Sequence, residues 1–129
     1  MSVRVVDASA LGALAFGEPE AERVVRMLGH ESMTAPALLW FEMASICRKK
    51  IRRHPDKEDE LLDALKRAAC LPIRIVEVDQ TEVVQLSVKA GISTYDANYL
   101  WLARHLRAEL VTLDQPLREA ASRHGVHAP

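Results

Sequence analysis

Two short apolar segments, one near each end of the chain, most constrain how it can fold, because each is followed at once by an aspartate. Residues 3–6 precede Asp7, and residues 110–113 precede Asp114. Short runs of this kind predict buried strands. In an open parallel sheet, ligands bind outside the carboxyl ends of the strands. We therefore expect Asp7 and Asp114 to face the same crevice.

The stretches around these segments carry helical patterns. Proline or acidic residues near the start, and glycine or basic residues near the end, mark several of the helices. We predict further strands over 32–34 and 73–78, and helices over 10–16, 18–29, 37–53, 55–67, 81–89, 94–107 and 116–124. The helix over 37–53 is apolar nearly all round at its start, which predicts that it is buried there. Strands that alternate with helices imply a parallel sheet in a layered α/β sandwich.

The size and composition of the chain limit the class of protein. With 129 residues and no repeat, low-complexity segment or linker, it is expected to form one domain over residues 1–129. Hydrophobic residues make up 49% and charged residues 27%, which argues against disorder. The formal net charge is −1, so binding to nucleic acid would need a local basic patch rather than a basic protein.

We expect no membrane or export segment. The uncharged stretch 8–17 is shorter than the roughly 20 residues that span a bilayer, and Asp7 interrupts what would be the apolar region of a signal peptide. Cys47 and Cys70 fall in helical patterns among apolar neighbours, so we expect reduced core residues rather than a disulfide. These features predict a cytoplasmic protein.

Two more acids, Glu42 and Asp96, fall on helix faces that are otherwise largely apolar. At 100° per residue, their neighbours on those faces are Leu38, Leu39, Ser45 and Ile46 for Glu42, and Tyr99, Leu100 and Ala103 for Asp96. An unpaired carboxylate in such a place is strongly disfavoured, and neither acid has a Lys or Arg three or four positions away. Lys49, two turns from Glu42, is a weaker rival partner. A hard divalent metal is the cation we expect.

Each acid taken alone also has a purely structural interpretation. An aspartate between a strand and a helix, such as Asp7 or Asp114, commonly caps the helix N-terminus. Asp96 lies in a first helical turn, where the helix dipole favours an acid. The four acids together are more informative than any one of them.

A basic run near the end of the helix over 37–53 is a candidate RNA contact. Its cations could bind phosphates, or they could simply form a solvated helix end that suits the dipole, and the two interpretations are about even. The residues are Arg48, Lys49, Lys50, Arg52 and Arg53. The five histidines show no metal-ligand spacing. Large apolar residues at helical spacing, including Trp40, Trp101, Met27 and Met43, are expected in the core or in an interface.

The order and spacing of the acidic motifs resemble those of one family. The segments Val5-Val6-Asp7-Ala8-Ser9, Glu42 in a helix opened by proline, Tyr95-Asp96-Ala97, and Thr112-Leu113-Asp114 with Leu117 look like the PIN domain. Within that family, the length and the short spacer helices resemble the toxin subunits of VapBC toxin–antitoxin modules. The resemblance covers essentially the whole chain.

The resemblance implies a fold, an activity and a set of partners. The fold would be a PIN-like three-layer α/β/α sandwich with a short central parallel sheet. The activity would be that of a Mg²⁺- or Mn²⁺-dependent endoribonuclease toxin that cleaves RNA, forms a homodimer and is silenced by a cognate antitoxin. The family's acidic tetrad falls on Asp7, Glu42, Asp96 and Asp114, and its supporting hydroxyls fall on Ser9 and Thr112. The short tail after His124 leaves open whether a final edge strand is present.

The chemistry of phosphodiester hydrolysis suits these residue types. Carboxylates repel a phosphodiester unless a divalent cation reverses the local charge and activates a water. Because Mg²⁺ is usually held by one or two carboxylates and several waters, we expect Asp7 and Asp96 as direct ligands. Glu42 and Asp114 would act directly or through water, and one of them could position the nucleophilic water.

Two other classes of protein remain open. The first is a flavodoxin-like receiver domain, a Mg²⁺-binding phosphoacceptor. That class needs a Lys just after a late strand, where this chain has Asp114-Gln115-Pro116. The second is a PIN-fold binding or regulatory protein without nuclease activity, in which the acids are only structural. A haloacid-type phosphatase would need an acid at position 9, where Ser9 stands.

Overall fold

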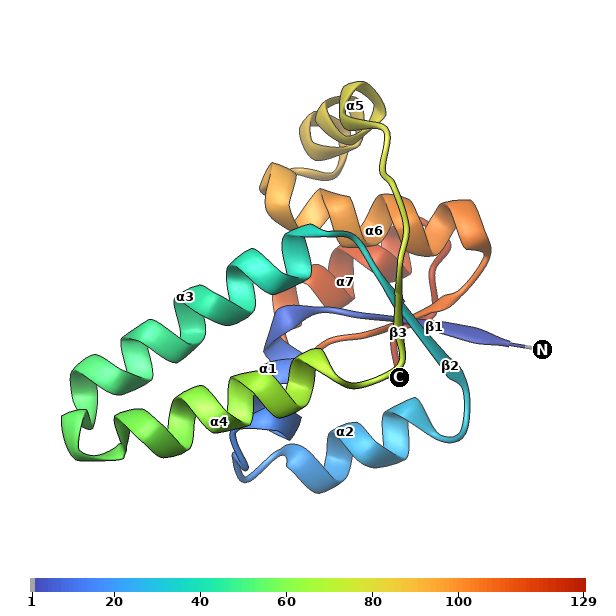
Figure 1. Cartoon of the computed structure of the whole chain (residues 1–129). Helices are drawn as coiled ribbons and strands as arrows, with labels where there is room; N and C mark the ends of the chain where they lie inside the picture. The colour runs from blue at the N-terminus through green and yellow to red at the C-terminus, as the bar shows by residue number, and fades with distance from the viewer. Residues whose placement is uncertain (1) are drawn as a thin grey trace.

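A four-stranded parallel sheet forms the centre of the computed structural model, which describes residues 2–129 (Figure 1). Its strands are β1 (Val3–Val6), β2 (Ser32–Ala35), β3 (Ile73–Ile75) and β4 (Glu109–Val111). Their spatial order is β3-β2-β1-β4, and every neighbouring pair is parallel. The predicted parallel sheet is therefore confirmed. The strand order differs from the 2-1-3-4-5 order of flavodoxin-like receivers, so that alternative is wrong.

Helices cover both faces of the sheet. They are α1 (Ala8–Ala15), α2 (Ala21–Leu28), α3 (Leu38–Arg53), α4 (Glu58–Ala69), α5 (Gln80–Ala90), α6 (Thr94–Leu106) and α7 (Gln115–Arg123), with the 3₁₀ turn η1 (Pro55–Lys57) before α4. Figure 1 shows the strands between α5, α6 and α7 on one side and α1, α2 and α4 on the other, and the two core clusters contain residues of the same helices. This is the expected three-layer α/β/α sandwich.

Alternation along the strands divides the core into two parts. Val5 of β1 and Leu110 of β4 are register partners and pack with α5, α6 and α7. Val6 and Val111, one position further along, pack on the opposite face with α1 to α4. All four side chains are fully buried. Successive side chains of a strand point to opposite faces, so two neighbouring positions on each strand contribute to the two cores.

The strands end earlier than the apolar runs predicted. The predicted strand over 73–78 ends at Ile75, although the Val76 amide still donates to the Ala35 carbonyl at 3.0 Å. Beyond that point β2 offers no partner, because Pro36 has no N–H and the chain turns into α3. The predicted strand over 110–113 runs over Glu109–Val111. The chain after β4 instead builds the loop described below.

Two predicted burials are wrong. The start of α3 is not buried all round: Phe41 is 73% exposed, since α3 buries a single stripe made by Leu39, Met43 and Cys47. Cys70 is exposed just after the end of α4, whereas Cys47 is buried as predicted. Both thiols are free.

The C-terminal tail and the helices add two findings. The Leu110 amide of β4 donates to the His127 carbonyl at 3.0 Å, so the tail runs beside β4 without forming a further strand within residues 2–129. Across the same residues, no helix combines the length and apolar character needed to cross a membrane.

Candidate active site at the carboxyl ends of the strands

The site lies where the direction of the strand order reverses. From β1 the sheet continues to β2 and β3 on one side, while β4 lies on the other side. Such a switch point opens a crevice outside the carboxyl ends of the strands. Asp7 follows β1 directly, and its amide donates to the Val111 carbonyl of β4 at 3.2 Å. This bond brings the loop after β4 next to Asp7.

Asp7 is held by hydrogen-bond donors on both carboxylate oxygens. Oδ1 accepts from the Ser9 hydroxyl at 2.7 Å and from the Ala10 amide at 3.0 Å. Oδ2 accepts from the Thr112 hydroxyl at 2.5 Å. Asp7 is only 4% exposed, so these donors replace much of its lost hydration. The Ala10 contact is also the N-cap of α1, which explains why this helix starts at Ala8 rather than at the predicted residue 10.

The same two hydroxyls organise the loop after β4. The Leu113 amide donates to Ser9 Oγ at 2.9 Å, and the Asp114 amide donates to Thr112 Oγ1 at 3.0 Å. Ser9 Oγ and Thr112 Oγ1 are 3.3 Å apart. Asp114 then caps α7 by accepting from the Leu117 amide at 2.9 Å. The network ties Asp7 and Asp114 into one rigid unit.

Glu42 and Asp96 reach the site from α3 and α6. Tyr99, which is 1% exposed, donates its hydroxyl to Glu42 Oε1 at 2.5 Å and so joins the two helices. Gly12 of α1 lets α3 approach, since a Cβ at this position would lie 3.3 Å from Ile46 Cδ1. The backbone amide of Asp96 donates to Ser93 Oγ, which caps α6 and so fixes the first turn that carries the Asp96 carboxylate.

The causes of the pKa shifts at Asp7 and Asp96 indicate that the four acids lie near one another. Burial raises the pKa of Asp7 from 3.8 to about 6, against the lowering effect of its three donors, and the charge of Glu42 raises it further. Burial also raises the pKa of Asp96, and the charges of Asp114 and Glu42 add to this. The pKa of Tyr99 is raised by burial and by its bond to Glu42. All four predicted acids therefore meet in one electrostatically coupled cluster.

No ion pair joins a side-chain cation to this cluster within residues 2–129. The ion pairs of the described chain join Arg4 and His127 to Glu109, and Lys50 to Glu18. Lys49, the rival partner of Glu42, forms no ion pair with it in that part of the chain. Four like charges without a counter-charge form a site with a marked preference for a cation.

The donor set fits a hard divalent cation, because every candidate ligand is a carboxylate or hydroxyl oxygen. Within residues 2–129, however, no three acidic, His or Cys side chains form an arrangement that would enclose a metal ion. Mg²⁺ does not need such a cage, since it usually keeps several waters and uses one or two carboxylates. The residues present thus fit a partly hydrated ion rather than an all-protein metal cage.

Two hollows flank the acids. One, of about 570 Å³, is bordered by Phe41 beside Glu42 and by Tyr95 beside Asp96. Phe41 and Tyr95 are 73% and 61% exposed. The other hollow, of about 340 Å³, is lined in part by Ser9, Leu113 and Lys50. None of the four acids lines either hollow, but residues next to them in the sequence do.

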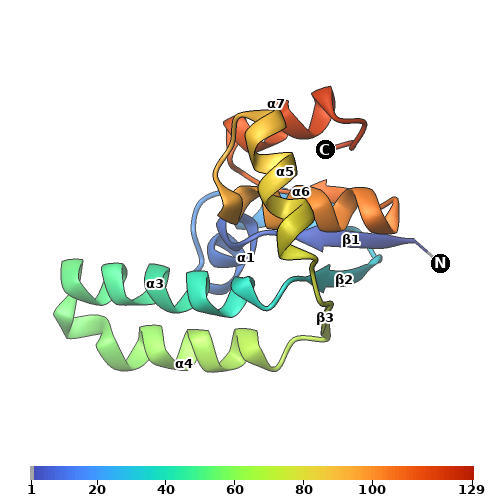
Figure 2. The ribbon, with the colours of Figure 1, turned by 90° about the horizontal axis from the view of Figure 1, so that it is seen from above.

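Of the predicted basic run, the structure brings only Lys50 to a hollow beside the acids. At about 1.5 Å per residue, Arg53 lies about 16 Å along α3 from Glu42. Figure 2 shows that α3 and α4 project together beyond the rest of the molecule. Lys50 is paired with Glu18 and lies 5.7 Å from the centre of the Phe16 ring. The other four basic residues, Arg48, Lys49, Arg52 and Arg53, are exposed.

Two residues contribute to the site that the sequence did not mark as functional. Helical spacing places Tyr99 on the face of Asp96, three residues later, but only as an apolar neighbour and not as a partner of Glu42. Arg118 donates from Nη2 to the Thr112 carbonyl at 2.7 Å and so braces the loop that carries Asp114. The sequence signal for this role was its position four residues after Asp114, since residues four apart on a helix are neighbours.

Comparison with known proteins agrees with this geometry. The PIN domain family matches residues 4–122. A protein of Pyrobaculum aerophilum named Ribonuclease VapC3 is 31% identical over 120 residues, which cover 89% of this chain and 92% of the relative. The crystal structure of PAE2754 from P. aerophilum superimposes with a TM-score of 0.77 and 25% identity, covering 99% of this chain and 92% of that one.

A more distant structure shares only the fold. VapBC2 from Rickettsia felis, solved bound to a DNA fragment from its promoter, gives a TM-score of 0.68 at 12% identity, covering 98% of this chain and 97% of that one. The family match spans nearly all of the sheet and helices described above, and the VapC3 relative shares close to a third of its residues over the same region. The chain therefore belongs to the PIN domain family and, within it, to the VapC ribonucleases.

Proposed function

We propose that this protein is a metal-dependent endoribonuclease that hydrolyses RNA phosphodiesters, and that it is the toxin of a toxin–antitoxin module. The observation that carries the proposal is the cluster of Asp7, Glu42, Asp96 and Asp114. It lies at the switch point of the sheet, and no ion pair joins it to a cation of the described chain. The membership of the chain in the VapC ribonucleases supports the same activity.

We assign metal binding and the positioning of water to different acids according to their surroundings. Asp7 and Asp96 would hold Mg²⁺ or Mn²⁺, since Asp7 is fixed by three donors and Asp96 lies in the first turn of α6. When bound, the ion supplies positive charge against the phosphodiester and a nucleophilic water at neutral pH. Glu42 is oriented by Tyr99, and Asp114 is oriented by its cap of α7; one of the two would position the attacking water and take up its proton.

The hydroxyls have a positioning role in this scheme. Ser9 and Thr112 each donate to Asp7, so that the carboxylate stays ionised and aimed although burial opposes its charge. Their hydrogen bonds are charge-assisted and correspondingly strong. In this proposal the phosphate of the RNA would enter a crevice that is otherwise anionic. The exposed basic residues near the end of α3 would contact RNA only at some distance from the cleaved bond, because they lie along the projecting helix.

Incubation of the purified protein with total RNA tests the proposal. Cleavage should require Mg²⁺ or Mn²⁺ and stop in EDTA, and the products should carry a 5′-phosphate and a 3′-hydroxyl, because water is the nucleophile. Glu42→Gln should remove activity, while Glu22→Gln, which changes an exposed acid on α2, should cleave like the parent. Products with 2′,3′-cyclic phosphate ends would contradict the mechanism. Failure to cleave any RNA with all four acids intact would favour a PIN-fold binding protein.

An antitoxin would be the natural inhibitor of such an enzyme in the cytoplasm. We propose that it covers the acidic crevice and inserts an Arg or Lys near Asp7 and Asp96, since a guanidinium can bridge carboxylates in a bidentate manner. Expression of this chain alone should slow growth, and co-expression of a small neighbouring reading frame should restore it. Asp7→Asn is the matched control and should be harmless at the same protein level.

We also propose that two copies associate as a homodimer. The exposed apolar side chains of Phe41, Ile75 and Tyr95 around the larger hollow would suit such a contact. Light scattering of the purified chain would measure the mass, and Phe41→Glu should shift it toward that of a monomer. An unchanged mass for the parent and the variant at the monomer value would contradict this assembly.

A further inference from the structure

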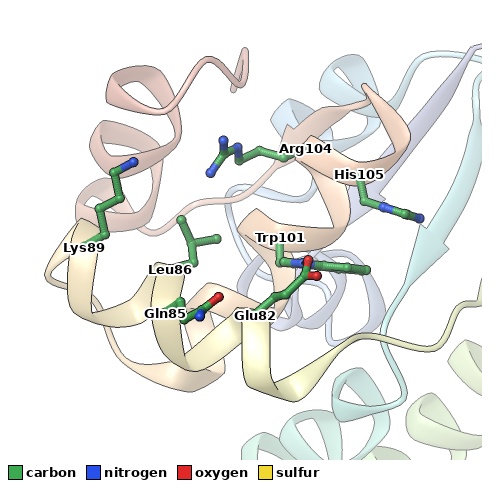
Figure 3. A pocket seen from close by; sticks show the side chains of 7 residues that line it. All are labelled: Glu82, Gln85, Leu86, Lys89, Trp101, Arg104 and His105. Atoms are coloured by element: carbon green, nitrogen blue, oxygen red, sulfur yellow. The ribbon is translucent and has the colours of Figure 1, made fainter.

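A further pocket, separate from the two hollows beside the acids, lies on the other side of α6 from the acids. It has a volume of about 440 Å³ and opens between α5 and α6 (Figure 3). Asp96 and His105 are nine residues apart on α6, which places them on opposite faces of that helix and about 14 Å apart along its axis. None of the four acids of the candidate active site lines this pocket.

One end of the pocket is a flat aromatic wall. The rings of Trp101 and His105 stack with their centres 4.6 Å apart and their planes 12° from parallel. His105 is exposed, so its outer face is open to a further ring. The Trp101 indole N–H donates to Glu82 Oε1 at 2.9 Å, which fixes the indole against α5. Such a wall can extend its stack by one flat, electron-rich ring.

The other end of the pocket is cationic. Figure 3 shows the Lys89 and Arg104 side chains directed toward the same space, away from Trp101 and His105. Burial lowers the pKa of the nearby His124, and the positive charges of Arg104, Lys89 and Arg123 lower it further. Lys89, Arg104 and Arg123 come from α5, α6 and α7, and they form a basic cluster with no ion-pair partner in residues 2–129.

Between the two ends lie groups that can hydrogen-bond the hydroxyls of a sugar or the edge of a base. Gln85 offers an amide, with one acceptor and two donor hydrogens, and Glu82 offers a carboxylate that Trp101 already positions. Leu86 supplies an apolar floor and is only 6% exposed. A stacking wall, a hydrogen-bonding edge and a pair of cations in sequence match the three parts of a nucleotide.

From this arrangement we propose that the pocket between α5 and α6 binds a nucleotide, with its base stacked on His105 and its phosphate between Lys89 and Arg104. The nucleotide is either one unit of a single-stranded RNA or a free mononucleotide, since both present the same base and phosphate. The site is separate from the acids and needs no divalent metal, so its occupancy can be measured in EDTA, where RNA is not cleaved. Failure of the nucleotide-binding proposal can therefore be distinguished from failure of the nuclease proposal.

Trp101 fluorescence provides the test. In a Trp40→Phe background Trp101 is the only tryptophan. Titration with adenosine 5′-monophosphate or with a short oligoadenylate should quench it saturably, and inorganic phosphate should bind more weakly than either. His105→Ala should weaken nucleotide binding roughly tenfold, in line with the loss of one stacked base. Tighter binding of the oligomer would assign the site to an RNA strand, and equal binding would assign it to a free nucleotide.

Charge variants test the phosphate contacts, and a second measurement tests binding to the unaltered chain. The double variant Lys89→Glu, Arg104→Glu should lower the affinity by about tenfold or more. The slope of log K against log salt concentration for oligomer binding should become shallower by about 0.7 for each lost phosphate contact. Lys66→Glu with Arg67→Glu, the same charge change on α4, should leave binding unaltered. Anisotropy of a labelled oligomer repeats the measurement on the unaltered chain, whatever the fate of the Trp40→Phe protein. The proposal is overturned if no nucleotide binds saturably, if phosphate alone binds as well, or if both charge variants lose equal affinity.

Discussion

Replacement of Asp7 by Asn separates the charge of this residue from its structural role. The wild-type carboxylate is 4% exposed and accepts from Ser9, Ala10 and Thr112. Asparagine has nearly the same shape, keeps one acceptor oxygen and caps a helix about as well as aspartate. The variant should therefore fold, and the main physical change is the loss of one buried negative charge.

The pKa of Asp7 sets the size of the effect on stability. Its folded value of about 6 lies above the ordinary 3.8, so the folded state binds more protons than the unfolded state between these values. The wild type therefore loses stability as the pH rises from about 4 to above 6, by about 3 kcal/mol for this group. In the Asp7→Asn protein, one hydrogen of the introduced side-chain amide will lack a partner, at a cost of about 1 kcal/mol. The net gain for the variant at pH 8, without metal, is about 2 kcal/mol.

Thermal unfolding in EDTA at a series of pH values measures this directly. For a chain of this length about 1 kcal/mol corresponds to roughly 4 °C in Tm, so Asp7→Asn should melt about 8 °C higher at pH 8. The advantage should shrink as the pH falls, vanish near about pH 4.5 and turn into a disadvantage of up to about 1 kcal/mol at lower pH, where the wild-type carboxyl is protonated in both states and only the cost of the unpaired amide remains. In the same preparations, RNA cleavage with Mg²⁺ should fall by orders of magnitude.

Two results would refute this reasoning. A variant that melts at the same temperature as the wild type at every pH would mean that the Asp7 charge is not strained by burial. A variant that cleaves RNA at the wild-type rate with metal present would mean that the charge is not needed for the reaction. Glu22→Gln again serves as the control, since the change at this exposed acid should alter neither property.

Three further outcomes are expected. Mg²⁺ at about 100 times its Kd should stabilise the wild type by about 2.7 kcal/mol, and the Asp7→Asn protein by much less, as measured by Tm with and without metal. Thr112→Val should destabilise the fold by about 1–3 kcal/mol in denaturant titrations, because the Asp7 carboxylate loses a donor and the Asp114 amide loses an acceptor. It should also raise the pKa of Asp7 further, which NMR titration of the side-chain carboxyl would detect. Tyr99→Phe should cost about 2 kcal/mol and lower the cleavage rate, because Glu42 loses the hydroxyl that orients it; an unchanged rate would show that Glu42 needs no such support.

Much of the fold was predictable because local signals agreed with one another. The β-branched run over 3–6 and the proline and glycine marks at helix ends predict the correct order of strands and helices. The parallel sheet and its layers followed from the alternation alone. What the local pattern could not supply was where each strand loses its partner: β3 ends at Ile75 because β2 turns into α3, and that depends on a neighbour distant in sequence.

The side chains that were misplaced show the same limit. Phe41 lies in a run of apolar residues, yet it is exposed because α3 packs only one stripe against α1 and α4. Cys70 has apolar neighbours in sequence but follows the end of α4, where no element covers it. A hydrophobic run predicts burial of a segment, whereas the packing partner decides which of its residues are covered.

The acidic cluster could be anticipated because helical periodicity and strand ends each point a side chain in a defined direction. Asp7 and Asp114 follow adjacent strands, and Glu42 and Asp96 project from helices that reach the same edge. The contact between Tyr99 and Glu42 joins residues 57 positions apart, and no spacing rule predicts it. The pocket between α5 and α6 was not predicted either: Trp101, which was expected in a core or an interface, packs partly against the core and also lines an open space with His105.

The helix-cap interpretation of Asp7 and Asp114 and their proposed role in catalysis do not compete. Each aspartate caps its helix through Oδ1, which accepts from the amide three residues later. Capping leaves Oδ2 of Asp114 without a hydrogen bond in residues 2–129, and Oδ2 of Asp7 has one donor, Thr112, for its two lone pairs. Because the cap fixes the direction of the carboxylate, the remaining lone pairs are held in place without further loss of side-chain freedom. The two roles can be told apart only by a change that keeps the cap and removes the charge, which is why substitution by asparagine, and not by alanine, is the informative one at both positions.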